Sequence, residues 1–209
     1  MARVENGNLN GNIGNLNYYQ RDGKTFARKR RGKNKNRAQG KQLQGCLKLK
    51  IATHFVSLIG EFIKVSFVAE GKEKQLTPYN SAMSGILNHA IVGEAPNQEL
   101  DMTKVLVAKG GLVPPINPIM TCSDNRLIFT WEVSDFSWPS ANERVMLLAY
   151  SPEWGEVNYD LAGAQRSKGT GSLEVSTSWR GKKIETYIAF RAETGDMVSN
   201  SIYTGSITF

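Results

Sequence analysis

The hydrophobic period of the chain changes near residue 100. Before this point, apolar residues recur every four positions at Leu43, Leu47, Ile51, Phe55 and Ile59. After it, apolar and polar residues alternate, as they do across residues 127–133. A period near 3.6 is that of an amphipathic helix, and a period of two is that of a strand with one buried face. The sequence therefore predicts an α+β chain whose helices and strands occupy separate segments.

Residues 42–99 form the predicted short helical region. Gly60 is expected to kink or divide its first helix, because glycine is a poor helix former. Pro78 ends this pattern, and a second, shorter helix is predicted at residues 81–91, where the apolar residues fall on one side.

Residues 100–209 form the predicted β domain. Short strands are expected at residues 104–108, 127–133, 145–150, 157–161, 172–175, 184–190 and 201–207, with turns rich in Pro, Gly and Asn between them. This spacing predicts an Ig-like or fibronectin-III-like antiparallel β-sandwich. Trp131 alternates with Phe129 and Val133, so we expect it in the core of the sandwich.

Residues 1–41 are predicted to be an extended, basic, Asn/Gly-rich arm that carries a β-hairpin. Asp22 and Gly23 separate two strand-like runs, and both residue types readily adopt the positive φ of a two-residue turn. The expected cross-strand pairs are Arg21–Lys24, Tyr19–Phe26 and Asn17–Arg28. Because an isolated two-stranded ribbon is marginally stable, we expect the hairpin to dock on another surface.

The formal net charge of +7 is unevenly distributed. Residues 1–50 hold thirteen Lys and Arg against Glu5 and Asp22, a net charge of +11, and the remainder of the chain carries −4. The residues that we expect to bind polyanions are Arg28, Lys29, Arg30, Arg31, Lys33, Lys35 and Arg37. Such a run attracts nucleic acid, an anionic membrane surface or the acidic body of a neighbouring copy, and the charge alone does not choose among these.

The residue content argues against the common enzyme classes. Gly23-Lys24-Thr25 ends like a phosphate-binding loop, but Tyr18 occupies the position of the required first glycine. Two cysteines, Cys46 and Cys122, and two histidines, His54 and His89, supply neither a metal-ligand spacing nor a nucleophile–histidine–acid group. We therefore expect no catalytic, cofactor or metal site and no small-molecule substrate, although a carboxylate pair for glycoside hydrolysis stays open among the scattered acids.

The sequence gives weaker evidence about the cellular location of the protein and about the role of its loops. The absence of an apolar run of about 18 residues and of an apolar N-terminal segment predicts neither a membrane span nor a secretory signal. We therefore expect a cytoplasmic or particle-associated protein with unpaired cysteines. Trp138, Trp154 and Trp179 lie near turns, where they either stack on a ligand or cap the ends of the sandwich.

Several segments resemble an uncharacterised domain-of-unknown-function family of Bacteroidota. They are the Met1-Ala2-Arg3 start with spaced glycines, the basic Gly23-Lys24 turn, the helix at residues 55–67, the Phe129-Thr130-Trp131 strand and the ending Ser-Asn-Ser-x-Tyr-x-Gly at residues 199–205. The resemblance covers nearly the whole chain. It implies the architecture described above and no particular activity.

Two functional hypotheses follow. The first is a non-enzymatic structural protein, a capsid, tail-like or filament subunit, that forms a homo-oligomer through its arm. Its expected contact residues are Leu9, Ile13, Leu16, Tyr18, Tyr19 and Phe26. The alternative is an adaptor whose basic arm binds nucleic acid or another polyanion, with Tyr18, Tyr19 and Phe26 stacking on bases. A carbohydrate-binding or carbohydrate-cleaving sandwich comes third.

Overall fold

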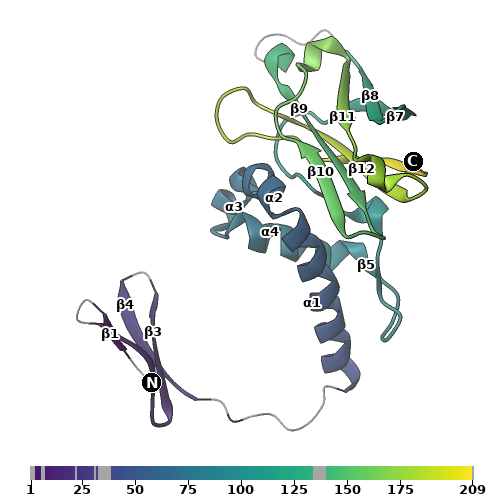
Figure 1. The fold of residues 1–209 in the computed structure, drawn as a ribbon. Coiled ribbons are helices and arrows are strands. Elements are labelled where there is room, and N and C mark those ends of the chain that lie inside the picture. Colours follow the sequence, from purple (N-terminus) through teal and green to yellow (C-terminus); the bar gives the residue numbers. More distant parts are fainter. Residues whose placement is uncertain are drawn as a thin grey trace. The chain divides into compact units, whose positions relative to one another are not determined.

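The computed structural model describes residues 3–5, 8–21, 23–30, 32, 39–133 and 140–208, and Figure 1 shows their fold. The chain divides into two compact units, Met1–Gln39 and Gly40–Phe209. The first unit is built from short strands, and the second combines helices with antiparallel sheets, of which the two main ones have four and three strands. The chain is therefore mixed α and β, as the change of hydrophobic period predicts.

The first unit is a four-stranded antiparallel sheet in the order β1-β2-β3-β4. Its strands are β1 Arg3–Glu5, β2 Asn8–Ile13, β3 Leu16–Arg21 and β4 Lys24–Lys29. β3 and β4 form the predicted hairpin with the predicted register, because Tyr19 lies opposite Phe26 and Arg21 lies opposite Lys24. Gly23 adopts a φ of 72°, which favours glycine, whereas Asp22 lies outside the described residues.

The segment before the hairpin differs from the arm that we expected. β2 pairs with β3 and β1 pairs with β2, so the hairpin has neighbouring strands within its own unit. Asn and Gly have low strand propensity, which concealed these strands. Leu9 and Ile13 nevertheless alternate with asparagines, and this period of two is the signal that could have revealed β2.

The second unit begins with helices. They are α1 Gly40–Leu58, α2 Gly60–Ser66, α3 Val68–Lys74 and α4 Pro78–Gly85, followed by a π-helical turn at Ile86–Ala90. The first helix ends at Leu58, close to the predicted break at Gly60. The second predicted helix starts earlier than expected, at Pro78, because the Thr77 side chain caps it by accepting a hydrogen bond from the Asn80 N–H at 3.2 Å.

Two antiparallel sheets follow the helices. One has the order β10-β9-β12-β13, with strands Glu156–Asp160, Arg144–Ser151, Lys183–Arg191 and Ile202–Thr208. The other has the order β11-β8-β7, with strands Thr170–Glu174, Arg126–Glu132 and Ile116–Ser123. A short ladder joins β5 Ile91–Val92 to β6 Glu99–Leu100. Six of the seven predicted strands are present with shifted ends.

The strand predicted at residues 104–108 is wrong. Its start belongs to a 3₁₀ turn, Met102–Lys104, and the following residues run without a strand partner. Conversely, β7 was missed. This strand contains Pro118 and a register shift between Ile116 and Ile119, features of edge strands that disrupt the alternation.

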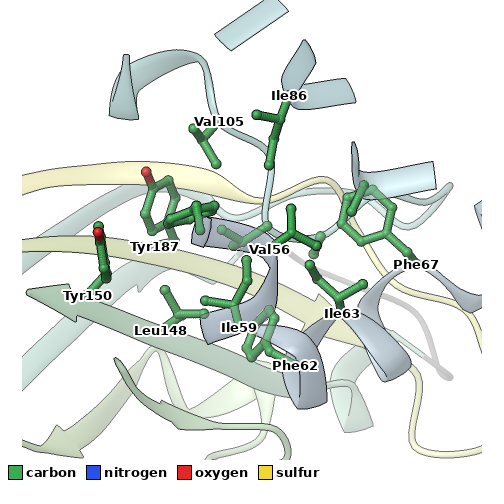
Figure 2. Packing of buried hydrophobic residues seen from close by; sticks show 14 of the residues in the cluster. Val56, Ile59, Phe62, Ile63, Phe67, Ile86, Val105, Leu148, Tyr150 and Tyr187 are labelled. Carbon is green, nitrogen blue, oxygen red and sulfur yellow. The ribbon is translucent and has the colours of Figure 1, made fainter. Parts of the chain in front are cut away.

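Two apolar clusters hold the second unit together. In the first, helix residues such as Val56, Ile59 and Phe62 pack against Leu148 and Tyr187 of the sheet, as Figure 2 shows. The second cluster lies between the two sheets and contains Trp131, which is 5% exposed and confirms the predicted core tryptophan. β9 and β12 contribute to both clusters, so their sheet is covered on both faces, and the helices share a core with the strands.

Candidate functional site

The N-terminal sheet carries most of the residues that the sequence singles out. Leu9 and Ile13 lie on β2, Leu16, Tyr18 and Tyr19 lie on β3, and Phe26, Arg28 and Lys29 lie on β4. Arg30 follows β4 directly, and its N–H donates to the Asn15 carbonyl at 2.6 Å. The predicted polyanion-binding residues Arg31, Lys33, Lys35 and Arg37 lie outside the described residues.

One side of this sheet, which we term the apolar face, carries Ile13, Leu16, Tyr18 and Ala27, with the polar residues Gln20, Thr25 and Lys29 toward its edge and end. The register places Ile13 opposite Leu16 and Tyr18 opposite Ala27, and directly opposed side chains lie on the same side of a sheet. Ile13 is 49% exposed and Leu16 is 40% exposed. Val4 on β1 lies opposite Leu9 on β2. Val4 is 69% exposed, so this pair adds further exposed apolar surface to the sheet.

The other side, which we term the aromatic-basic face, carries Tyr19, Phe26, Arg21, Lys24 and Arg28. The Tyr19 and Phe26 rings stack with centroids 5.7 Å apart and an interplanar angle of 22°. The Arg28 guanidinium carbon lies 5.6 Å from the centroid of the Tyr19 ring, within cation–π range. On the same side, Asn17 donates from Nδ2 to Asn12 Oδ1 at 2.7 Å.

The two faces separate residues that the sequence analysis grouped together. Tyr18 and Tyr19 are adjacent in the chain and therefore point to opposite sides of β3. Tyr18 joins the apolar face, whereas Tyr19 and Phe26 join the basic one. The period of two in residues 16–21 and the predicted hairpin register already imply this separation, and the observed register confirms it.

Among the described residues of the first unit, no further layer covers the apolar face. The described residues of the first unit lie in its four strands, in their turns or in the chain that follows β4. Neither a helix nor a second sheet of this unit therefore packs on the exposed Ile13 and Leu16 side chains. An uncovered apolar sheet face is typical of a protein–protein contact surface.

The described tryptophans near turns of the second unit differ in burial. Trp179 is 2% exposed, and its Nε1 donates to Glu156 Oε2 at 2.8 Å, so it fills the core of the unit. Trp154 is 54% exposed. Trp138 lies outside the described residues.

The Ser-Asn-Ser ending has a structural role. Ser201 Oγ accepts hydrogen bonds from the N–H groups of Val107 and Ala108 at 2.9 and 3.3 Å. Asn200 Oδ1 accepts from the Gly110 N–H at 3.2 Å, and Ser199 Oγ accepts from the Phe190 N–H at 2.9 Å. Ser201 and Asn200 thus satisfy the backbone of the irregular segment before β7, and Ser199 satisfies a backbone group of β12, which explains these residue types without a ligand.

The buried carboxylates of the second unit are paired. Arg166 Nη1 and Glu143 Oε2 lie 2.6 Å apart. Glu185 accepts from the Tyr203 hydroxyl at 2.6 Å, and burial together with this carboxylate raises the pKa of Tyr203 to about 12. In the part of the chain that the structure describes, no group of three His, Cys, Asp or Glu side chains could hold a metal ion.

A cleft of about 210 Å³ lies between α3, α4 and the 3₁₀ turn at Met102–Lys104. Its lining includes Phe67, His89 and Leu106. The cations beside it already have partners, because Lys74 and Lys109 pair with Glu70, and Lys104 pairs with Asp101. The cleft is thus a weak candidate for a charged ligand. Across the described helices, none is long and apolar enough to cross a membrane.

Comparison with known proteins identifies a family whose function is unknown. A model of a family of unknown function, DUF6266, matches residues 8–205. The match covers β2, β3, β4 and all but the end of the second unit. No curated protein matches the chain.

Proposed function

Since the chain belongs to the DUF6266 family, a family of unknown function, we propose a role from its own geometry. The protein is a non-enzymatic structural subunit that self-assembles through its N-terminal sheet, as a capsid, tail-like or filament component does. Its partner is a second copy of the same chain. The observation that carries the proposal is the apolar face, which no layer of the described part of its own unit covers.

Face-to-face packing of two such sheets supplies the missing layer. Sheets stack about 10 Å apart when their apolar side chains interdigitate, and three or more strands with a buried apolar face form a stable unit. In a twofold contact, Ile13, Leu16 and Tyr18 of one copy meet the same residues of the other. Assembly therefore completes a two-layer structure from a one-layer unit.

The distribution of charge favours contact through this face. Ile13, Leu16, Tyr18 and Ala27 are uncharged, with Lys29 at the end of β4 beside Leu16. Contact through the opposite side would instead bring Arg21, Lys24 and Arg28 of each copy against their counterparts. Like charges in contact oppose association, so the two sides of the sheet are not equivalent.

Light scattering coupled to size-exclusion chromatography tests the proposal on nuclease-treated protein. Replacing Ile13 and Leu16 together with threonine keeps strand-compatible residues and removes apolar contact area. We expect self-association at least about tenfold weaker, because each change occurs on both sides of the interface.

The matched control replaces Tyr19 and Phe26 with threonine in the same sheet but on its other face. This variant should associate like the natural chain, although it disturbs the sheet to a similar extent. A natural chain that stays monomeric at all accessible concentrations, or equal losses in the two variants, would contradict assembly through the apolar face.

We further infer that the second unit contains an Ig-like or fibronectin-III-like sandwich to which the helices have been added. Support comes from its strand order. Counting from β7 to β13 in the described chain, the first, second and fifth strands form one sheet, and the fourth, third, sixth and seventh form the other. The two sheets enclose the cluster around Trp131, as in a Greek-key sandwich.

A further inference from the structure

We propose that the aromatic-basic face of the N-terminal sheet binds single-stranded nucleic acid. This inference concerns the side of the sheet that the proposed assembly leaves free. It does not depend on assembly, because a monomer presents the same side.

The first step of the argument is the pair of exposed rings. Tyr19 is 39% exposed and Phe26 is 42% exposed, although both are large aromatic residues on a regular sheet. The two rings stack on one another, with planes that differ by 22°, and form one exposed aromatic platform across β3 and β4. An exposed aromatic pair on a sheet is suited to stacking against bases, which are flat and aromatic themselves.

The second step is the placement of positive charge around the rings. Arg28 lies on one side of the platform and contacts Tyr19. Arg21 and Lys24 lie opposite one another at the other end of the hairpin, on the same face. Alternate residues on a strand are about 6.8 Å apart, so cations flank the rings in both directions along the strands. The phosphate backbone of a nucleic acid whose bases stack on the rings therefore meets a cation on each side.

The third step concerns the kind of nucleic acid. In a duplex the base faces are stacked on one another, and only their edges are accessible in the grooves. The exposed rings cannot reach these faces, whereas the unstacked bases of a single strand can stack against them. The pairing of stacking groups with cations also distinguishes this face from a surface that attracts any anion through charge alone.

Fluorescence anisotropy of nuclease-treated, full-length protein with a labelled single strand of about 16 nucleotides tests the proposal. A duplex of the same length and anionic lipid vesicles serve as competitors. We expect the single strand to bind at least about tenfold more tightly than the duplex. Vesicles should not displace it.

The variants separate stacking from charge. Replacing Tyr19 and Phe26 with valine should weaken single-strand binding by about tenfold or more and leave the salt dependence unchanged. Replacing Arg21, Lys24 and Arg28 with glutamine should reduce the slope of log K against log salt by roughly 2, since each phosphate contact in a single strand contributes about 0.7. Tyr19→Phe keeps the ring and should bind like the natural chain.

Two controls distinguish a specific loss of binding from a loss of folding. The Ile13→Thr, Leu16→Thr variant of the opposite face should retain binding, and circular dichroism checks that each variant keeps its strands. A 2-aminopurine base in the oligonucleotide reports stacking directly through quenching, which only ring-containing variants should produce. Equal affinity for duplex and single strand, unaltered binding in the valine variant, or preferential binding to vesicles would overturn the proposal.

Discussion

At the scale of single residues, the sequence predicts chemical character better than position. Trp131 was placed in the core because it alternates with other apolar residues, and the structure confirms it. The same pattern could not distinguish the buried Trp179 from the exposed Trp154, since both lie near turns and differ only in their tertiary neighbours. For Tyr18 and Tyr19, by contrast, the predicted hairpin register already implied opposite sides of the strand, and the structure confirms this register.

Trp131 provides the residue-scale prediction. Its ring meets the edge of Phe190 with centroids 5.4 Å apart, and its Nε1 donates to the Arg166 carbonyl at 2.8 Å. Trp131→Ala should therefore lower the free energy of unfolding by about 3 to 5 kcal/mol. Urea denaturation measures this loss. Trp154→Ala serves as the control, because an exposed side chain should cost less than about 0.5 kcal/mol, and similar losses for the two variants would contradict the core assignment.

At the scale of elements, periodicity found the strands whose side chains follow it. β8 alternates clearly, whereas β9 and β12 are almost continuously buried because both of their faces are covered. β7 escaped because Pro118 and a register shift interrupt its pattern. Residues 104–108 imitate a strand, but their backbone is held by Ser201 rather than by a neighbouring strand.

Glu70 on α3 provides the element-scale prediction. Its carboxylate Oε1 lies 2.6 Å from Lys74 Nζ and 2.8 Å from Lys109 Nζ, and these hydrogen-bonded ion pairs hold the pKa of Glu70 below its ordinary value of 4.5. A carboxyl with a lowered pKa stabilises the fold above its unfolded-state value, and this contribution is lost as the pH falls through the folded-state value. Stability should therefore fall as the pH drops below about 4.5.

Thermal unfolding of Glu70→Gln between pH 7 and pH 3 measures this contribution. The variant should be less stable than the natural chain at pH 7, and the difference should shrink toward pH 3. Glu61→Gln is the matched control, because Glu61 also pairs with a lysine on its own helix but is largely exposed. A difference for Glu70→Gln that does not vary with pH would contradict the role of its ion pairs.

At the scale of the whole molecule, the sequence predicted the classes of structure and the uneven charge, and it did not predict how the parts combine. The change of period near residue 100 suggested separate helical and β regions, yet Ile59 of the helices and Leu148 of β9 share one core. Long-range packing of this kind leaves no local signal. In the N-terminal sheet the hairpin register was predicted, whereas the pairing of β1 and β2 was not, so the contact of Ile13 with Leu16 became visible only in the structure.

Sedimentation velocity tests the central claim most directly, by comparing nuclease-treated full-length protein with residues 40–209, a compact unit with its own core. Because the proposed contact is apolar, the full-length chain should associate with rising concentration at both low and high salt, while residues 40–209 stay monomeric. Identical sedimentation of the two proteins across concentration and salt would contradict self-assembly through the N-terminal sheet.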